Sequence, residues 1–110
     1  MQSMGFYMAQ RLSAMVMAPL VLGHIAVMIY AIQGGLSTAE ILERTRGSLS
    51  WFAFYGSFVV AVSIHAAIGL RMIATETLKL RGAALDLFTW AVMIVLLFMG
   101  ARAVSAVTML

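Results

Sequence analysis

Three long apolar runs, at about residues 12–32, 51–71 and 84–102, constrain the fold of this chain more than any other feature. At about 1.5 Å of helix rise per residue, each run is long enough to cross a hydrocarbon core of about 30 Å. Charged residues make up only 10% of the sequence, against about 25% in soluble globular domains. The sequence therefore predicts an all-α membrane protein whose three transmembrane helices form a single anchor domain over residues 1–110.

Basic residues indicate which end of the helices faces the cytoplasm. Arg11 lies just before the first run. Arg71 ends the second run, and Lys79 and Arg81 follow in the connection to the third run. In a three-span protein these positions share one side of the membrane, which the positive-inside rule assigns to the cytoplasm. We therefore expect a cytoplasmic N-terminus. The net charge of +3 is read as a topology signal and not as a nucleic-acid-binding face.

The connection between the first two runs contains the start and stop signals of a short helix. Ser37 is followed three residues later by Glu40, which is the spacing of a capping box at a helix N-terminus. Gly47 suits the position just after a helix C-terminus. We expect a short interfacial helix from about Thr38 to Arg46, between the first and second spans.

Both histidines of the chain, His24 and His65, lie inside apolar runs. An ionisable side chain is expensive inside a bilayer and marks a functional site by default. Neutral imidazole is a strong ligand for transition metals and haem iron. A histidine in a membrane bundle also commonly hydrogen-bonds across a helix interface, and residue type alone leaves both roles open. Gly69, one turn after His65, leaves room for a flat macrocycle, although it would equally allow close helix packing.

The two histidines are expected at different depths in the membrane. His65 lies six residues before Arg71, which puts it roughly 9 Å from the cytoplasmic boundary. His24 lies thirteen residues after Arg11, roughly 20 Å from the same boundary. This offset argues against one haem bound by both histidines of one chain. Each histidine would need a second ligand from another subunit, and two ligating histidines would mean two haems at two depths.

Two sequence blocks resemble the membrane-anchor subunits of succinate dehydrogenase and fumarate reductase, the complex II family. The segment HAAIGLRMIATE, residues 65–76, resembles the second span of those anchors, which carries a haem-ligating histidine. The segment QRLSAMVMAPL, residues 10–20, is similar to the start of their first span. The order of the blocks and the three-helix layout agree with the same family. The matching positions of the first block are His65, Gly69, Arg71 and Glu76.

The resemblance implies roles for particular residues near the cytoplasmic ends of the helices. His65 matches the ligand of a b-type haem, and Arg71 would meet a haem propionate. Arg11 and Ser13 match the region that lines the quinone site or approaches a propionate, and Glu76 would also lie near the quinone. Anchoring at the membrane surface is an open alternative for both arginines.

The chain departs from the family pattern at three positions. Glu76 replaces the usual aspartate, and Thr77 replaces the tyrosine that often hydrogen-bonds the quinone. His24 is not a feature of anchors with one haem, but it resembles a ligand of the two-haem members, whose single anchor chain has five spans. By that resemblance, two chains of this kind would complete two haem sites, so one or two haems b are expected in the assembled anchor.

The resemblance implies a non-catalytic subunit in a complex of the bacterial inner membrane. This subunit would pass electrons between an iron–sulfur subunit, which binds a flavoprotein subunit, and membrane quinone, in a reaction of the tricarboxylic acid cycle. The second anchor chain would be identical or similar. Two alternatives stay open: a haem-free anchor with only a quinone site, and a small transport or assembly component whose histidines relay protons.

Overall fold

The structure is a computed structural model, and it describes residues 4–109. Three helices in it are long and apolar enough to cross a membrane, and the described residues contain no strand. The predicted all-α fold, with three long helices and a short one between the first two, is therefore confirmed. In chain order the helices are α1 (Met4–Gly34), α2 (Thr38–Thr45), α3 (Leu49–Thr77) and α4 (Gly82–Thr108).

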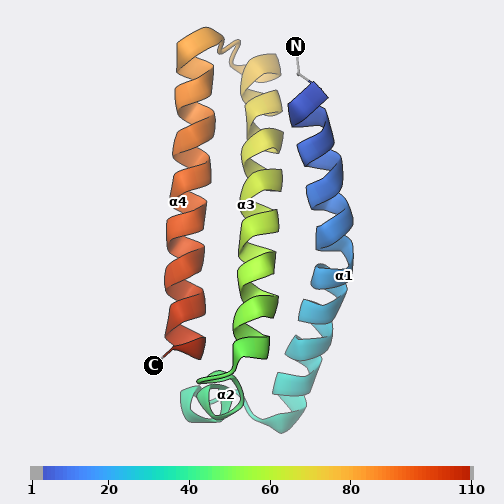
Figure 1. Ribbon diagram of the computed structural model, residues 1–110, viewed down its shortest axis with the longest axis vertical. Coiled ribbons are helices and arrows are strands. Elements are labelled where there is room, and N and C mark those ends of the chain that lie inside the picture. The colour runs from blue at the N-terminus through green and yellow to red at the C-terminus, as the bar shows by residue number, and fades with distance from the viewer. Residues whose placement is uncertain (1–3, 110) are drawn as a thin grey trace.

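The three long helices lie side by side, with α3 between α1 and α4 (Figure 1). The start of α1 and the connection from α3 to α4 lie at one end of the bundle. The short helix α2 and the end of α4 lie at the other (Figure 1). The basic residues used to predict orientation lie in α1 (Arg11), in the last part of α3 (Arg71) and in the α3–α4 connection (Lys79 and Arg81), and thus belong to the same half of the molecule.

The long helices extend beyond the predicted apolar runs. They contain 31, 29 and 27 residues, or about 40–47 Å of helix at 1.5 Å per residue. This exceeds a hydrocarbon core of about 30 Å, so their ends reach the headgroup region or the helices tilt. The apolar runs cover only the part of each helix that can lie in the hydrocarbon core. Backbone hydrogen bonding continues each helix beyond that part, through polar residues.

Small residues form the interfaces of α3, and large apolar residues face outward. The buried residues of α3 are Ala61, Ser63, Ala67, Ile68 and Ala74. Small residues let helix backbones approach closely in a membrane, where apolar burial alone gives little driving force. On α4, Gly100 lies directly against the side chain of Val59 from α3. The outer faces of α1 and α4 instead expose leucine, isoleucine and methionine, as lipid contact requires.

The start of α2 is fixed by the predicted capping box. The Ser37 hydroxyl accepts a hydrogen bond from the Glu40 backbone N–H at 3.2 Å, and the Glu40 carboxylate accepts one from the Ser37 backbone N–H at 3.3 Å. The helix ends at Thr45, one residue before the expected end. Gly47 follows with a φ of 73°, a left-handed conformation that favours glycine.

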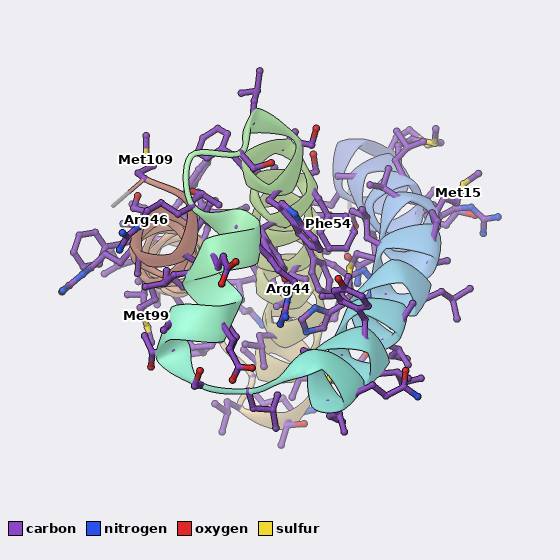
Figure 2. The ribbon with its side chains drawn as sticks, turned by 90° about the horizontal axis from the view of Figure 1, so that it is seen from below. Met15, Arg44, Arg46, Phe54, Met99 and Met109 are labelled. Atoms are coloured by element: carbon purple, nitrogen blue, oxygen red, sulfur yellow. The ribbon has the colours of Figure 1, made fainter. Side chains whose placement is uncertain are left out.

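Polar contacts dock α2 and its following turn onto the end of α4. The Thr45 hydroxyl donates to the carbonyl of Val107 at 2.6 Å, and the Gly47 backbone N–H donates to the carbonyl of Thr108 at 2.6 Å. Figure 2 views this end of the molecule, with α2 lying across the long helices. The contacts satisfy carbonyl groups in the last turn of α4, which have no partner within the helix.

Gly100→Ala should destabilise the packing of α3 against α4, because the added methyl group would run into the β-branched side chain of Val59. Overpacking of this kind costs about 1–3 kcal/mol. We expect a loss of that size in the free energy of unfolding, measured by SDS titration with circular dichroism in mixed micelles. Gly56→Ala is the matched control, since a methyl group there meets nothing within 4 Å. Equal stability of the two variants would contradict this packing.

Acidification should loosen the first turn of α2. Hydrogen bonds from Ser37 hold the pKa of Glu40 below its usual range. The ionised Glu40 carboxylate therefore stabilises the first turn of α2 fully above the ordinary glutamate pKa. This stabilisation is lost as the pH falls through the lowered pKa of Glu40. Backbone NMR shifts of residues 38–41 should report this loss. Glu40→Gln retains a side chain able to complete the capping box but cannot titrate, so the NMR shifts of this variant should stay constant with pH. If the wild-type shifts were also insensitive to acid, the role of the Glu40 carboxylate in the capping box would be refuted.

Candidate functional site

The predicted haem ligand His65 contacts Ser13 across the α1–α3 interface. Ser13 is the buried residue of α1, and its hydroxyl oxygen lies 3.4 Å from Nδ1 of His65. The same hydroxyl donates to the backbone carbonyl of Gln10 at 3.0 Å. Within residues 4–109 no hydrogen bond reaches Nε2 of His65. The half-buried imidazole thus has a polar partner on one nitrogen, and its other nitrogen is available to a ligand.

The space next to Gly69 is occupied in part by the side chain of Gln10. A methyl group on Gly69 would lie 3.6 Å from Nε2 of Gln10, an ordinary van der Waals distance. Oε1 of Gln10 is buried and has no hydrogen-bond partner within the described chain. Because buried amide oxygens are nearly always hydrogen-bonded, this oxygen marks a place where a donor from another molecule fits. Beside Gly69 the chain thus holds one buried acceptor without a partner among the described residues, and the Gln10 side chain packs there at ordinary contact distance.

Arg71 is bound to α4. Its Nη1 donates to the carboxylate of Asp86 at 2.9 Å and to the hydroxyl of Thr89 at 3.0 Å. Its guanidinium carbon also lies 4.6 Å from the centre of the Phe6 ring, within the range of a cation–π interaction. At about 100° per residue, Arg71 and His65 point about 120° apart around α3. Arg71 thus joins α3 to α4 on a different side of α3 from His65.

Arg11 and Glu76, expected near the quinone, have exposed side chains. Nη1 of Arg11 lies 3.4 Å from the Tyr7 hydroxyl on the same helix. Arg11 precedes Ser13 by two residues, so it points about 200° away around α1. The chain alone does not bring Arg11 to Ser13. A quinone site built from these residues would need a surface from a partner chain.

The second histidine, His24, lies among aromatic side chains of α3. Its ring is edge-on to Phe58, with a centroid distance of 5.2 Å, and to Tyr55, with a centroid distance of 6.3 Å. Nδ1 of His24 is buried without a hydrogen-bond partner in the part of the chain that the structure describes. A metal-ligating histidine almost always donates its other ring N–H to an acceptor. His24 has no such acceptor among the described residues, whereas Nδ1 of His65 lies within hydrogen-bond distance of the Ser13 hydroxyl.

The contacts place the two histidines at different levels of the bundle. His65 lies beside Ser13, and His24 lies beside Phe58. Phe58 precedes His65 by seven residues, which corresponds to about 10 Å along α3. The two imidazoles therefore do not face one another across a single site.

His24 borders a cavity of about 420 Å³ beneath α2, which is otherwise lined mainly by apolar residues. Arg44, Trp51 and Tyr55 also line it. Arg44 donates from Nη2 to the carbonyl of Gly35 at 3.3 Å, and Figure 2 shows it extending from α2 toward α1. The cavity lies at the opposite end of the molecule from the α3–α4 connection.

The donor set fits a haem ligand better than a closed metal site. No group of three or more histidine or acidic side chains within residues 4–109 is placed to hold a metal ion. A haem iron needs only one or two axial protein ligands, and His65 supplies one imidazole with an open nitrogen. The second axial ligand would have to come from another chain.

Three residues around the site were not assigned a role from the sequence. Gln10 had one signal, because it lies one turn before Ser13 within the quoted QR segment. Asp86 is the sole aspartate of the chain, but nothing in the sequence paired it with Arg71. Thr89 had no signal, since a threonine in an apolar run usually bonds its own helix. It does so here as well, donating to the carbonyl of Leu85.

A protein-family model described as the succinate dehydrogenase/fumarate reductase transmembrane subunit matches residues 2–101. This match spans most of the 110-residue chain and includes α3 and both histidines. No curated protein and no solved structure gave a match.

Arg71→Met should weaken the attachment of α3 to α4, because it removes a largely buried cation that is hydrogen-bonded to two side chains. Hydrogen bonds to charged groups contribute about 1.5–3 kcal/mol, and we expect a loss of this order in the free energy of unfolding in SDS titrations. Asp86→Asn should cost less than about 1 kcal/mol, since the Asp86 side chain is 61% exposed. Arg81→Met is the control in the same region. If Arg71→Met were as stable as the Arg81→Met control, the attachment of α3 to α4 through Arg71 would be excluded.

Proposed function

Because the chain belongs to the succinate dehydrogenase/fumarate reductase transmembrane subunit family, we propose that it is a haem-binding membrane anchor of such a complex. The complex would sit in the inner membrane of a bacterium, and the N-terminal end of the bundle would face the cytoplasm. There the anchor binds an iron–sulfur subunit, which in turn binds a flavoprotein subunit. The observation that carries the proposal is the family match together with the contact of His65 with buried Ser13.

We assign His65 as the axial ligand of a b-type haem. A haem in this position, when bound, supplies one-electron transfer between the iron–sulfur subunit and quinone. The chain itself supplies an imidazole at a fixed position in α3 and a buried hydroxyl beside its Nδ1. Gly69, one turn after His65, adds no side chain of its own, and the side chain beside it is that of Gln10. The apolar exterior of α1 and α4 holds this arrangement in lipid.

The haem site requires a second anchor chain, identical or similar to this one. One histidine lies at the level of Ser13, and the other lies about 10 Å away along the bundle. A second chain would donate the missing ligand at the level of His65. If His24 also binds haem, the same pairing would complete a second site at the level of Phe58. The buried, unpartnered Nδ1 of His24 would then need an acceptor from that partner.

The quinone site would form where the exposed ends of α1 and α3 meet the partner subunits. Arg11 and Glu76 lie at that end with exposed side chains, and the cation and the carboxylate can bond to the carbonyl or hydroxyl groups of a quinone. Ser13 lies deeper and contacts His65. A contact of Arg71 with a haem propionate would compete with the ion pair of Arg71 to Asp86. The exposed guanidinium of Arg11 has no ion pair among the described residues.

His65→Ala should remove at least one haem from the complex, because Nε2 of His65 is the proposed iron ligand. Complexes purified from membranes would be compared by the Soret band, by reduced-minus-oxidised spectra and by pyridine haemochrome content per flavin. His24→Ala is the matched control and should retain the haem bound by His65.

Three outcomes would overturn parts of this proposal. An intact wild-type complex without haem would leave a haem-free anchor with a quinone site only. Unchanged haem content in His65→Ala would move the ligand to another residue. Purification of the chain without flavoprotein or iron–sulfur subunits, together with ion-dependent uptake in vesicles, would favour a transport role.

A further inference from the structure

The Ser13 hydroxyl has a single hydrogen, and two polar atoms lie within hydrogen-bond distance of its oxygen. The nearer is the carbonyl oxygen of Gln10, 3.0 Å away, to which the hydroxyl donates within the first half of α1. The hydroxyl oxygen lies at 3.4 Å from Nδ1 of His65. A hydroxyl is one donor and offers two acceptor lone pairs. The shorter contact therefore takes the hydrogen, and a lone pair faces the imidazole.

A neutral imidazole carries one proton, on either Nδ1 or Nε2. We propose that Ser13 is a positioning residue that holds His65 in the Nδ1–H tautomer, with Nδ1–H donating to the Ser13 hydroxyl. This leaves the lone pair on Nε2, the nitrogen without a hydrogen bond in the described chain. The imidazole is thereby prepared to bind iron through Nε2 before any cofactor arrives.

The opposite tautomer leaves polar groups unsatisfied. With the proton on Nε2, the N–H would lack an acceptor among residues 4–109, and Ser13 would have to turn its hydrogen from Gln10 to the more distant Nδ1. An unpaired buried or lipid-facing N–H costs free energy. That form carries its lone pair on Nδ1, beside Ser13, and has none on the open Nε2. The Ser13 contact thus selects one form of the ring through hydrogen bonding alone.

His24 provides an internal comparison within the same chain. Its Nδ1 is buried and has no partner in the described residues, and its neighbours are the rings of Tyr55 and Phe58. Among residues 4–109 no hydrogen bond selects a tautomer for His24. The two histidines therefore differ in one property that can be measured in the isolated chain.

The consequence for haem binding rests on the proposed function, whereas the tautomer does not. A hydrogen bond from the ring N–H that does not bind the metal fixes the orientation of a ligating histidine. It also raises the basicity of the metal-binding nitrogen. Loss of the Ser13 hydroxyl should therefore weaken haem retention by about tenfold or more and raise the midpoint potential, since a less basic ligand stabilises the ferric state less.

The tautomer is tested directly by nitrogen NMR of the full chain in lipid nanodiscs, with ¹⁵N-labelled histidine. Only two histidines contribute signals, and a His24→Gln sample assigns them. We expect wild-type His65 to carry its proton on Nδ1. Ser13→Ala should shift the ratio of Nδ1–H to Nε2–H by roughly two- to tenfold, the effect of losing one hydrogen bond.

Matched variants separate the hydroxyl from a general packing effect. Ser13→Thr keeps a hydroxyl and should restore the wild-type tautomer, and Ser57→Ala removes a hydroxyl that has no hydrogen bond to either histidine and should change nothing. The inference is overturned if wild-type His65 is protonated on Nε2. It is also overturned if Ser13→Ala leaves the His65 signals unchanged.

A second arm uses the purified complex and measures haem retention and the haem midpoint potential in the same variants. If the Ser13→Ala complex retains the haem bound by His65 and its midpoint potential equals that of the wild type, the role of Ser13 is refuted. The proposed function would then remain intact. A complex without haem, in which His65 still carries its proton on Nδ1, would refute the proposed cofactor and leave the tautomer assignment intact.

Discussion

The central position of α3 is the constraint on which the rest of the molecule depends. In lipid there is little hydrophobic drive to bring helices together, so close packing of small residues and polar contacts hold the bundle. The small buried residues of α3 provide the packing. Polar side-chain contacts also tie α3 to both neighbours, through Ser13 of α1 and through Asp86 and Thr89 of α4.

The polar contacts of α3 differ in kind between its side facing α4 and its side facing α1. On the side of α4, Arg71 is held in a charged pair and a hydrogen bond, which is a structural arrangement. On the side of α1, Nδ1 of His65 contacts Ser13 and Nε2 has no hydrogen bond among residues 4–109, as the proposed haem ligation requires. Under the proposed function, one open imidazole at this level leaves the haem site incomplete. The proposed ligation would then give a chemical reason for the partnership with other subunits that family membership implies.

Local features of this structure followed from the sequence, and contacts between helices did not. The capping box at Ser37 depends on residues three apart, so the start of α2 was predicted to the residue. The three long helices followed from hydropathy, but their ends did not, because helices continue beyond the hydrocarbon core. The pairing of Arg71 with Asp86 depends on how α3 is rotated against α4. Ser13 was linked to His65 only in the structure, because a buried hydroxyl in an apolar run has no signal of its partner.

The most direct test of the central claim is a cryo-electron microscopy map of the intact complex purified from its native membrane. The account predicts haem density bonded to Nε2 of His65, with Nδ1 still facing Ser13 and the second axial ligand donated by another chain. A map with no haem at His65, or with one haem bound by both His65 and His24 of the same chain, would contradict it.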